Sequence, residues 1–329
     1  MMLATSDATC ERTPQSVLEE GLAVHLDRPV RIVEITSQPL NERSTHPIER
    51  LSVRLETGDE LPVIFKRLDP AARPGGGRQE VLIYQRVVPN ARFGAPVLYA
   101  SLYNHEEAQY WLFLEEVRGW TLDDGDWEDY LAAARSLGRL HGTYLEREAE
   151  LRQFGCLPEL GRWYYETAVR TARRNLHLAG AEEALVRFDG LMVGFNAVVR
   201  QLVRQPRALV HGDIFVHNIL IQSGGRIRLV DWELAAIGLP QWELSRLLSG
   251  WGTDKRHLVE VYLDEYQRAA GSPVNLPAFW RTLSQCEIVN PLLELGWSVE
   301  YCRDESKVSW ALRKLESIWR QLDGEATSG

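Results

Sequence analysis

The pattern of apolar residues changes near residue 119, and this change limits the folds open to the chain. Before it, apolar residues recur at every second position, as in 48–55, which is the period of a strand with one buried face. After it they recur every three or four positions, as in 181–204, which is the period of an amphipathic helix. Strands followed by helices indicate an α+β fold. We therefore expect an N-terminal lobe over 1–117 and a helical C-terminal lobe over 118–329.

The N-terminal region predicts a sheet built from hairpins. Thr57-Gly58-Asp59 separates two alternating segments, which is typical of a tight hairpin turn. The expected strands are 30–35, 48–55, 61–68, 95–103 and 110–117, and the expected helices are 16–26 and 79–88.

The C-terminal region predicts helices interrupted by one short hairpin. Ser223-Gly224-Gly225 indicates a turn between strands 219–221 and 226–230. The expected helices are 127–150, 181–204, 258–270, 279–299 and 308–322.

The residues around this hairpin carry the chemistry of phosphoryl transfer. Asp213 and Asn218 lie on one short loop, and the hairpin returns the chain so that Asp231 can face the same place. Phosphoryl transfer needs a carboxylate that orients and deprotonates the attacking hydroxyl, together with oxygen ligands for Mg²⁺. The three side chains supply these groups. Stabilisation of turns by Asp and Asn is the alternative interpretation.

His211-Gly212-Asp213-x4-Asn218 followed by Asp231-Trp232-Glu233 resembles the signature of the aminoglycoside phosphotransferase family, which is related to choline, homoserine and fructosamine kinases. The resemblance implies a protein-kinase-like two-lobed fold, ATP and Mg²⁺ as cofactors, Asp213 as the catalytic base, and Asn218 and Asp231 as metal ligands. Downstream, Gly238-Leu239-Pro240 and Glu243-Leu244-Ser245 fit the family pattern with two departures. Leu239 and Glu243 stand where an acidic residue and Asp are usual.

Upstream residues follow the same family order. The resemblance implies that Lys66, at the end of a predicted strand, binds the α- and β-phosphates and pairs with Glu80. It also implies that backbone groups of Glu115 and Val117 bind adenine at the hinge between the lobes. The turn at 38–45 lacks a glycine-rich motif, so Ser44, with Thr45, is the candidate there for contact with the β-phosphate.

The charge of the chain bears on its partners. With 37 basic and 46 acidic residues the formal net charge is −9, which argues against nucleic acid or an anionic membrane and favours a cationic or neutral small molecule. Glu287, Glu294 and Tyr301 share one predicted helix face that could bind a cationic acceptor. The chain has no long apolar segment and only four cysteines, so we expect a cytoplasmic protein.

The sequence predicts an enzyme that phosphorylates a hydroxyl of a small molecule. An antibiotic such as an aminoglycoside and a metabolite of choline, homoserine or sugar type both remain open as acceptors, as do ATP or GTP as donor and the oligomeric state. A catalytically silent nucleotide-binding scaffold is the rival, but Lys66, Asp213, Asn218 and Asp231 are all present. A zinc site at His211, Asp213 and His217 lacks a fourth ligand at suitable spacing.

Overall fold

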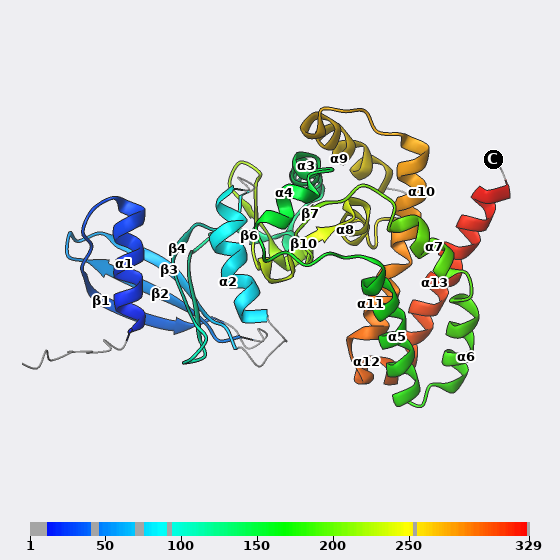
Figure 1. Cartoon of the computed structure of the whole chain (residues 1–329), viewed down its shortest axis with the longest axis horizontal. Coiled ribbons are helices and arrows are strands. Elements are labelled where there is room, and N and C mark those ends of the chain that lie inside the picture. Colours follow the sequence, from blue (N-terminus) through cyan, green and yellow to red (C-terminus); the bar gives the residue numbers. More distant parts are fainter. Residues whose placement is uncertain (1–11, 41–45, 70–75, 91–93, 253–254, 328–329) are drawn as a thin grey trace, which may run out of the picture. The chain divides into compact units, whose positions relative to one another are not determined.

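The chain forms two compact units, Met1–Arg118 and Gly119–Gly329 (Figure 1). The computed structural model describes residues 12–40, 46–69, 76–90, 94–252 and 255–327. The first unit contains an antiparallel five-stranded sheet, and the second is mostly helical, which confirms the α+β order expected from the sequence.

The sheet of the first unit has the strand order β1-β2-β3-β5-β4. Alternation along the strands turns Val53, Val63 and Phe113 to one face, where they form a core with residues of α1. Helix α2 packs against β4 and β5. The elements are α1 (Pro14–Leu26), β1 (Ile32–Pro39), β2 (Ile48–Leu55), β3 (Glu60–Arg67), α2 (Gly76–Arg86), β4 (Leu98–Asn104) and β5 (Gln109–Glu115).

The second unit contains two small antiparallel sheets among its helices, one of order β6-β8-β9 and one that pairs β10 with β7. Its strands are β6 (Trp120–Thr121), β7 (Ala208–Val210), β8 (Ile219–Gln222), β9 (Arg226–Leu229) and β10 (Ala236–Gly238). Its helices are α3 (Trp127–Tyr144), α4 (Glu148–Gln153), α5 (Arg162–Leu178), α6 (Glu182–Leu191), α7 (Phe195–Leu202), α8 (Pro240–Leu247), α9 (Lys255–Ala270), α10 (Leu276–Glu287), α11 (Val289–Trp297), α12 (Val299–Arg303) and α13 (Glu305–Thr327).

Three helices expected to be continuous are broken. The segment 127–150 divides into α3 and α4 because Glu146 adopts a left-handed conformation with φ of 58°. The segment 181–204 divides into α6 and α7 at the turn that ends with Gly194. The segment 279–299 divides into α10 and α11 next to Pro291, which has no N–H to continue the helical ladder.

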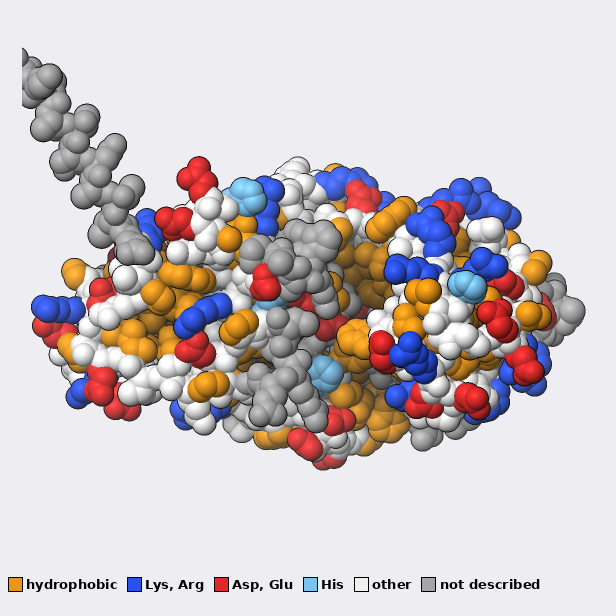
Figure 2. Space-filling view, turned by 90° about the horizontal axis from the view of Figure 1, so that it is seen from below, with side chains coloured by type: hydrophobic (Ala, Val, Ile, Leu, Met, Phe, Trp, Pro, Cys, Tyr) orange, Lys and Arg blue, Asp and Glu red, His pale blue; other side chains and the backbone are white. Residues whose placement is uncertain are grey.

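A large apolar core holds the helices of the second unit together. It joins residues of α5, α7, α11 and α13, including Leu176, Val199, Leu292 and Leu315, all fully buried. Over the helical region at the right of Figure 2, basic and acidic side chains are interspersed. Ion pairs such as Arg173–Asp189 and Arg187–Glu316 link the surface of these helices. Across the described residues, no helix is long and apolar enough to span a membrane.

Candidate functional site

The loop after β7 begins with a backbone conformation that only glycine adopts readily. Gly212 has φ of 85°, and a Cβ atom at this position would lie 2.0 Å from the carbonyl oxygen of Leu234. Any side chain would therefore force these two segments apart. The close approach places Asp213 directly after a tightly held turn.

His211 has a structural role in this loop. Its Nε2–H donates to the carbonyl oxygen of Val230 at 2.9 Å, and its Nδ1 accepts from the backbone N–H of Asp213 at 3.3 Å. The ring is fully buried and packs edge-on against Trp232. Because both ring nitrogens are engaged, His211 is a poor zinc ligand, which disfavours the alternative of a zinc site.

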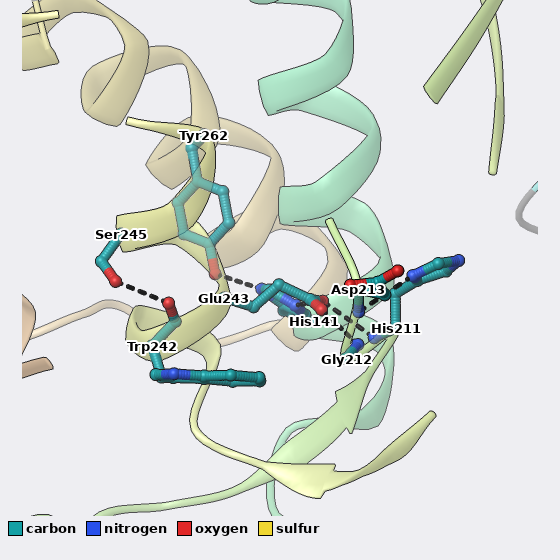
Figure 3. A network of polar contacts seen from close by, with 8 residues as sticks. All are labelled: His141, His211, Gly212, Asp213, Trp242, Glu243, Ser245 and Tyr262. Carbon is teal, nitrogen blue, oxygen red and sulfur yellow. Dashed lines mark hydrogen bonds and ion pairs between the residues drawn. The ribbon is translucent and has the colours of Figure 1, made fainter. Parts of the chain in front are cut away.

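Glu243 of α8 stabilises the loop that carries Asp213. Its carboxylate accepts hydrogen bonds from the backbone N–H groups of His211 and Gly212, at 2.9 and 2.5 Å. The ring of His141 in α3 lies 2.9 Å away through Nε2, and its Nδ1 lies 2.8 Å from the hydroxyl of Tyr262 in α9 (Figure 3). Glu243 of α8 thus links the loop that carries Asp213 to α3 through His141, and it makes these contacts where the family resemblance implies Asp.

Sequence reasoning missed His141 and Tyr262. The signal available was His141 itself, a polar residue on the apolar face of α3 that also carries Leu137 and Tyr144. Burial by itself raises the pKa of Glu243, but the hydrogen bond and charge of His141, with His211 nearby, outweigh burial and leave that pKa lowered. The carboxylate form of Glu243 is therefore the one that the fold stabilises.

Asp213 and Asn218 are in direct contact. The Nδ2 group of Asn218 donates to the Oδ2 atom of Asp213 at 2.8 Å and to its backbone carbonyl oxygen at 3.0 Å. The carbonyl end of the Asn218 amide consequently faces away from Asp213. Burial raises the pKa of the Asp213 carboxyl above its usual value, and the nearby charge of Arg246 opposes this shift.

The hairpin of β8 and β9 brings Asp231 to the same end of the unit. Ile219 pairs with Leu229, and the backbone N–H of Val230 donates to the carbonyl oxygen of Asn218 at 3.0 Å. Asp231 follows with φ of 64° and ψ of 63°, a left-handed conformation that is uncommon outside glycine and often marks functional sites. An amide oxygen and a carboxylate at one hairpin end are a donor set that fits Mg²⁺.

Lys66 and Glu80 form a buried ion pair within the first unit. Lys66 lies in β3 between Ile48 of β2 and Leu112 of β5, and its Nζ atom is 2.8 Å from Oε1 of Glu80 in α2. The two side chains are only 6% and 1% exposed. Exposed ion pairs of helices and strands are common, whereas a lysine this deeply buried is rare.

Of the remaining candidates of the first unit, Glu115 and Val117 lie at the end of β5 and just beyond it. Glu115 ends β5, where its backbone N–H donates to the carbonyl oxygen of Val97 at 2.8 Å, and Val117 follows outside the strand. Ser44 and Thr45 lie outside the described residues.

The sequence analysis placed Glu287, Glu294 and Tyr301 on one helix face, and two of them, Glu294 and Tyr301, are in contact. The hydroxyl of Tyr301 donates to Glu294 at 3.2 Å, and burial raises the pKa of Glu294. Glu287 instead pairs with Lys255 at 2.7 Å, and this partner offsets its charge. The binding of a cationic acceptor by this face stays a prediction.

Comparison with known proteins identifies the family. The profile of the phosphotransferase enzyme family matches residues 45–282, which is more than half of the chain and includes Lys66, Asp213 and Asp231. The chain belongs to this family. It is therefore a small-molecule phosphotransferase, which confirms the resemblance inferred from the sequence.

Solved structures show that this phosphotransferase has the fold of kinase-like relatives. Ethanolamine kinase from Plasmodium vivax matches with a TM-score of 0.58 at 14% identity, over 88% of this chain and 83% of the relative. A mutant aminoglycoside 2'-phosphotransferase-IIIa in complex with GDP matches with 0.58 at 16%, over 93% and 97%. Choline kinase LicA from Streptococcus pneumoniae matches with 0.55 at 14%, over 92% and 98%. A comparison with curated protein sequences found no significant match.

Proposed function

We propose that this phosphotransferase transfers the γ-phosphoryl group of ATP to a hydroxyl of a small molecule, with Mg²⁺ as the metal. The observation that supports it most is the contact between Asp213 and Asn218, because it joins a candidate base to a candidate metal ligand. Asp231, at the end of the adjoining hairpin, supplies the second oxygen ligand.

In this reaction Asp213 accepts the proton of the acceptor hydroxyl. The hydroxyl oxygen forms a bond to the γ-phosphorus, the bond from that phosphorus to the β,γ-bridging oxygen breaks, and ADP leaves. Asn218 orients the Asp213 carboxylate through its hydrogen bond. When bound, Mg²⁺ would neutralise the charge of the phosphates, with Asn218 and Asp231 as its ligands in the protein.

Residues of the first unit bind the nucleotide in this proposal. The ammonium of Lys66 contacts the α- and β-phosphates, and Glu80 holds it in place through the buried ion pair. Backbone groups at Glu115 and Val117 bind adenine, and Ser44, outside the described residues, stays the candidate of the sequence for contact with the β-phosphate. The solved relatives in complex with GDP or AMP support a nucleotide as the phosphoryl donor.

The test is the release of ADP in an acceptor screen that spans aminoglycosides, other hydroxylated antibiotics, amino alcohols, hydroxy acids and sugars. Asp213→Asn removes the proton acceptor while keeping the shape of the loop, so turnover should fall about 10²- to 10⁴-fold. Titration calorimetry should show nearly unchanged affinity for MgATP. Asp264→Asn, at an exposed position on α9, is the matched control and should keep full activity.

Two results would contradict the proposal. Full acceptor-dependent turnover in Asp213→Asn would remove the role of this residue. If the wild type binds MgATP but releases ADP no faster than the variant with any acceptor, the chain is a nucleotide-binding scaffold rather than an enzyme of this kind.

A further inference from the structure

An arginine lies beside the candidate base and has no assigned role. Arg246, near the end of α8, places its guanidinium carbon 4.4 Å from the ring centre of Phe215 and 5.7 Å from that of Trp242. Phe215 follows Asp213 by two positions on the catalytic loop and is 43% exposed. Stacking on two rings holds the guanidinium in a defined position next to this loop.

Arg246 lacks the anionic partner that such a group usually has. Its Nε atom is buried and has no hydrogen-bonding partner among the described residues. Within the same part of the chain, no carboxylate forms an ion pair with it at 4.0 Å or less. A buried Nε–H group without an acceptor loses hydration that nothing restores, so an oxygen-bearing anion would stabilise it.

A second unsatisfied donor, on Trp242, belongs to the same helix as Arg246. The indole Nε1 of Trp242 is buried and, like Arg246 Nε, has no partner among the residues that the structure describes. Both rings that flank the guanidinium, Phe215 and Trp242, are apolar surfaces on which an organic molecule can rest. The region therefore offers donors and aromatic faces, a combination that suits an oxyanion on an organic ligand.

The charge of Arg246 also acts on the two nearby acids. Burial raises the pKa of Asp213 and of Glu294, and the positive charge of Arg246 lowers both pKa values in part. Around the candidate base the positive charge of Arg246 therefore lies among the negative charges of Asp231 and Glu233. A cationic group placed against the guanidinium itself would be repelled by it, whereas an anionic group would be attracted.

We propose that Arg246 is a specificity-determining residue that binds an anionic oxygen group of the acceptor, a carboxylate or a phosphate. This inference rests on the proposed function and names the class of its acceptor. The guanidinium presents two parallel N–H donors that fit either oxyanion. The acceptor hydroxyl would then lie at Asp213 while the anionic group of the same molecule is held by Arg246.

The experiment measures ADP release with acceptors matched in all but charge. Short hydroxy acids are compared with their uncharged methyl amides, and a parallel series replaces the carboxylate by a phosphate monoester. The wild type should use anionic members at least about tenfold more efficiently, in kcat/KM, than the neutral ones. Which of the two series gives the higher value identifies the oxyanion.

Substitutions at position 246 assign this preference to the guanidinium. Arg246→Gln should lower kcat/KM for anionic acceptors about 10- to 100-fold while changing that for methyl amides by less than about twofold. Arg246→Lys should retain part of the preference, because an ammonium keeps the charge but not the planar fork. Arg200→Gln, at an exposed position on α7, is the control, and thermal melting of all variants reports on folding.

The possible outcomes separate the two proposals. Turnover confined to neutral or cationic acceptors would overturn the role of Arg246 and leave the proposed function intact. An equal loss with charged and neutral acceptors in a folded Arg246→Gln variant would also overturn it, since the arginine would then act on the transferred phosphoryl group. Absence of ADP release with every acceptor would overturn both.

Discussion

At the scale of single residues, the carboxylate of Glu243 stabilises the loop that carries Asp213. It is fully buried and accepts from two backbone N–H groups while contacting His141. Glu243→Gln would turn an amide N–H₂ toward donors, so we expect a loss of about 2 to 4 kcal/mol in the free energy of unfolding. Denaturant titration measures it. Glu316, a half-buried residue that pairs with Arg187, is the control, and Glu316→Gln should cost at most about 1 kcal/mol.

Glu243 also makes the free energy of unfolding depend on pH. Because the pKa of Glu243 is lowered in the folded state, its stabilisation is fully present above the unfolded value of about 4.3 and is lost as the pH falls through the folded value. Glu243→Gln should lack this component. The difference in unfolding free energy between wild type and variant should therefore shrink as the pH falls below about 4.3, and a constant difference would contradict the assignment.

Lys66 allows a second prediction at this scale. If its ammonium contacts the nucleotide phosphates, Lys66→Ala should lower kcat/KM for ATP about 10²-fold, because a charge-assisted contact is lost. Lys66→Arg should not restore activity, since the planar guanidinium differs in shape and the site is buried. Steady-state kinetics measure both. Lys255→Ala, which breaks the other Lys–Glu pair at Glu287, should leave the KM for ATP unchanged.

At the scale of elements, the close approach of α3 and α9 places His141 against Tyr262. A Cβ atom on Gly138 of α3 would lie 2.4 Å from the backbone carbonyl oxygen of Tyr262. Alanine normally stabilises a helix relative to glycine by about 1 kcal/mol, but here it must push the helices apart. Gly138→Ala should therefore lower the melting temperature and weaken the hydrogen bond between His141 and Glu243.

Gly190 offers the matched control for this prediction. It lies in α6, and no atom lies within 4 Å of a Cβ placed on it. Gly190→Ala should be neutral or raise the free energy of unfolding by up to about 1 kcal/mol. Thermal melts of both variants check the contrast, and equal effects would show that backbone propensity rather than helix packing decides the outcome.

At the scale of the whole molecule, each unit has its own apolar core. One core packs α1 on the N-terminal sheet, and another joins the helices of the second unit. Both cores consist of apolar side chains, and the second includes the free, buried thiols of Cys286 and Cys302. We therefore expect the stability of the fold to come from burial of apolar surface, without a structural zinc ion.

Removal of metal ions tests both this expectation about stability and the proposed role of Mg²⁺ in phosphoryl transfer. Chelation by EDTA should abolish phosphoryl transfer while shifting the melting temperature little, because only oxygen ligands at Asn218 and Asp231 would be emptied. Mg²⁺ or Mn²⁺ should restore activity. Stoichiometric zinc in the purified protein, or a large loss of melting temperature on chelation, would contradict it.

The sequence alone determined the fold class, the family and the local grouping of Asp213, Asn218 and Asp231. These residues lie on one loop and one hairpin, so their proximity follows from short-range backbone geometry, which periodicity and turn residues encode. The breaks at Glu146 and near Gly194 escaped prediction, because a positive φ or a local turn leaves the apolar period nearly unchanged.

Only the tertiary structure decided what surrounds this grouping. Glu243 meets His141 across 102 positions of sequence, and Arg246 stacks on Phe215 from another element. Such contacts depend on how α3, α8 and the catalytic loop pack in three dimensions, which no local pattern of residues specifies. For this reason the sequence predicted the candidate residues of the reaction and their proximity, whereas the contacts that support the loop and the charge beside Asp213 depend on the packing of distant segments.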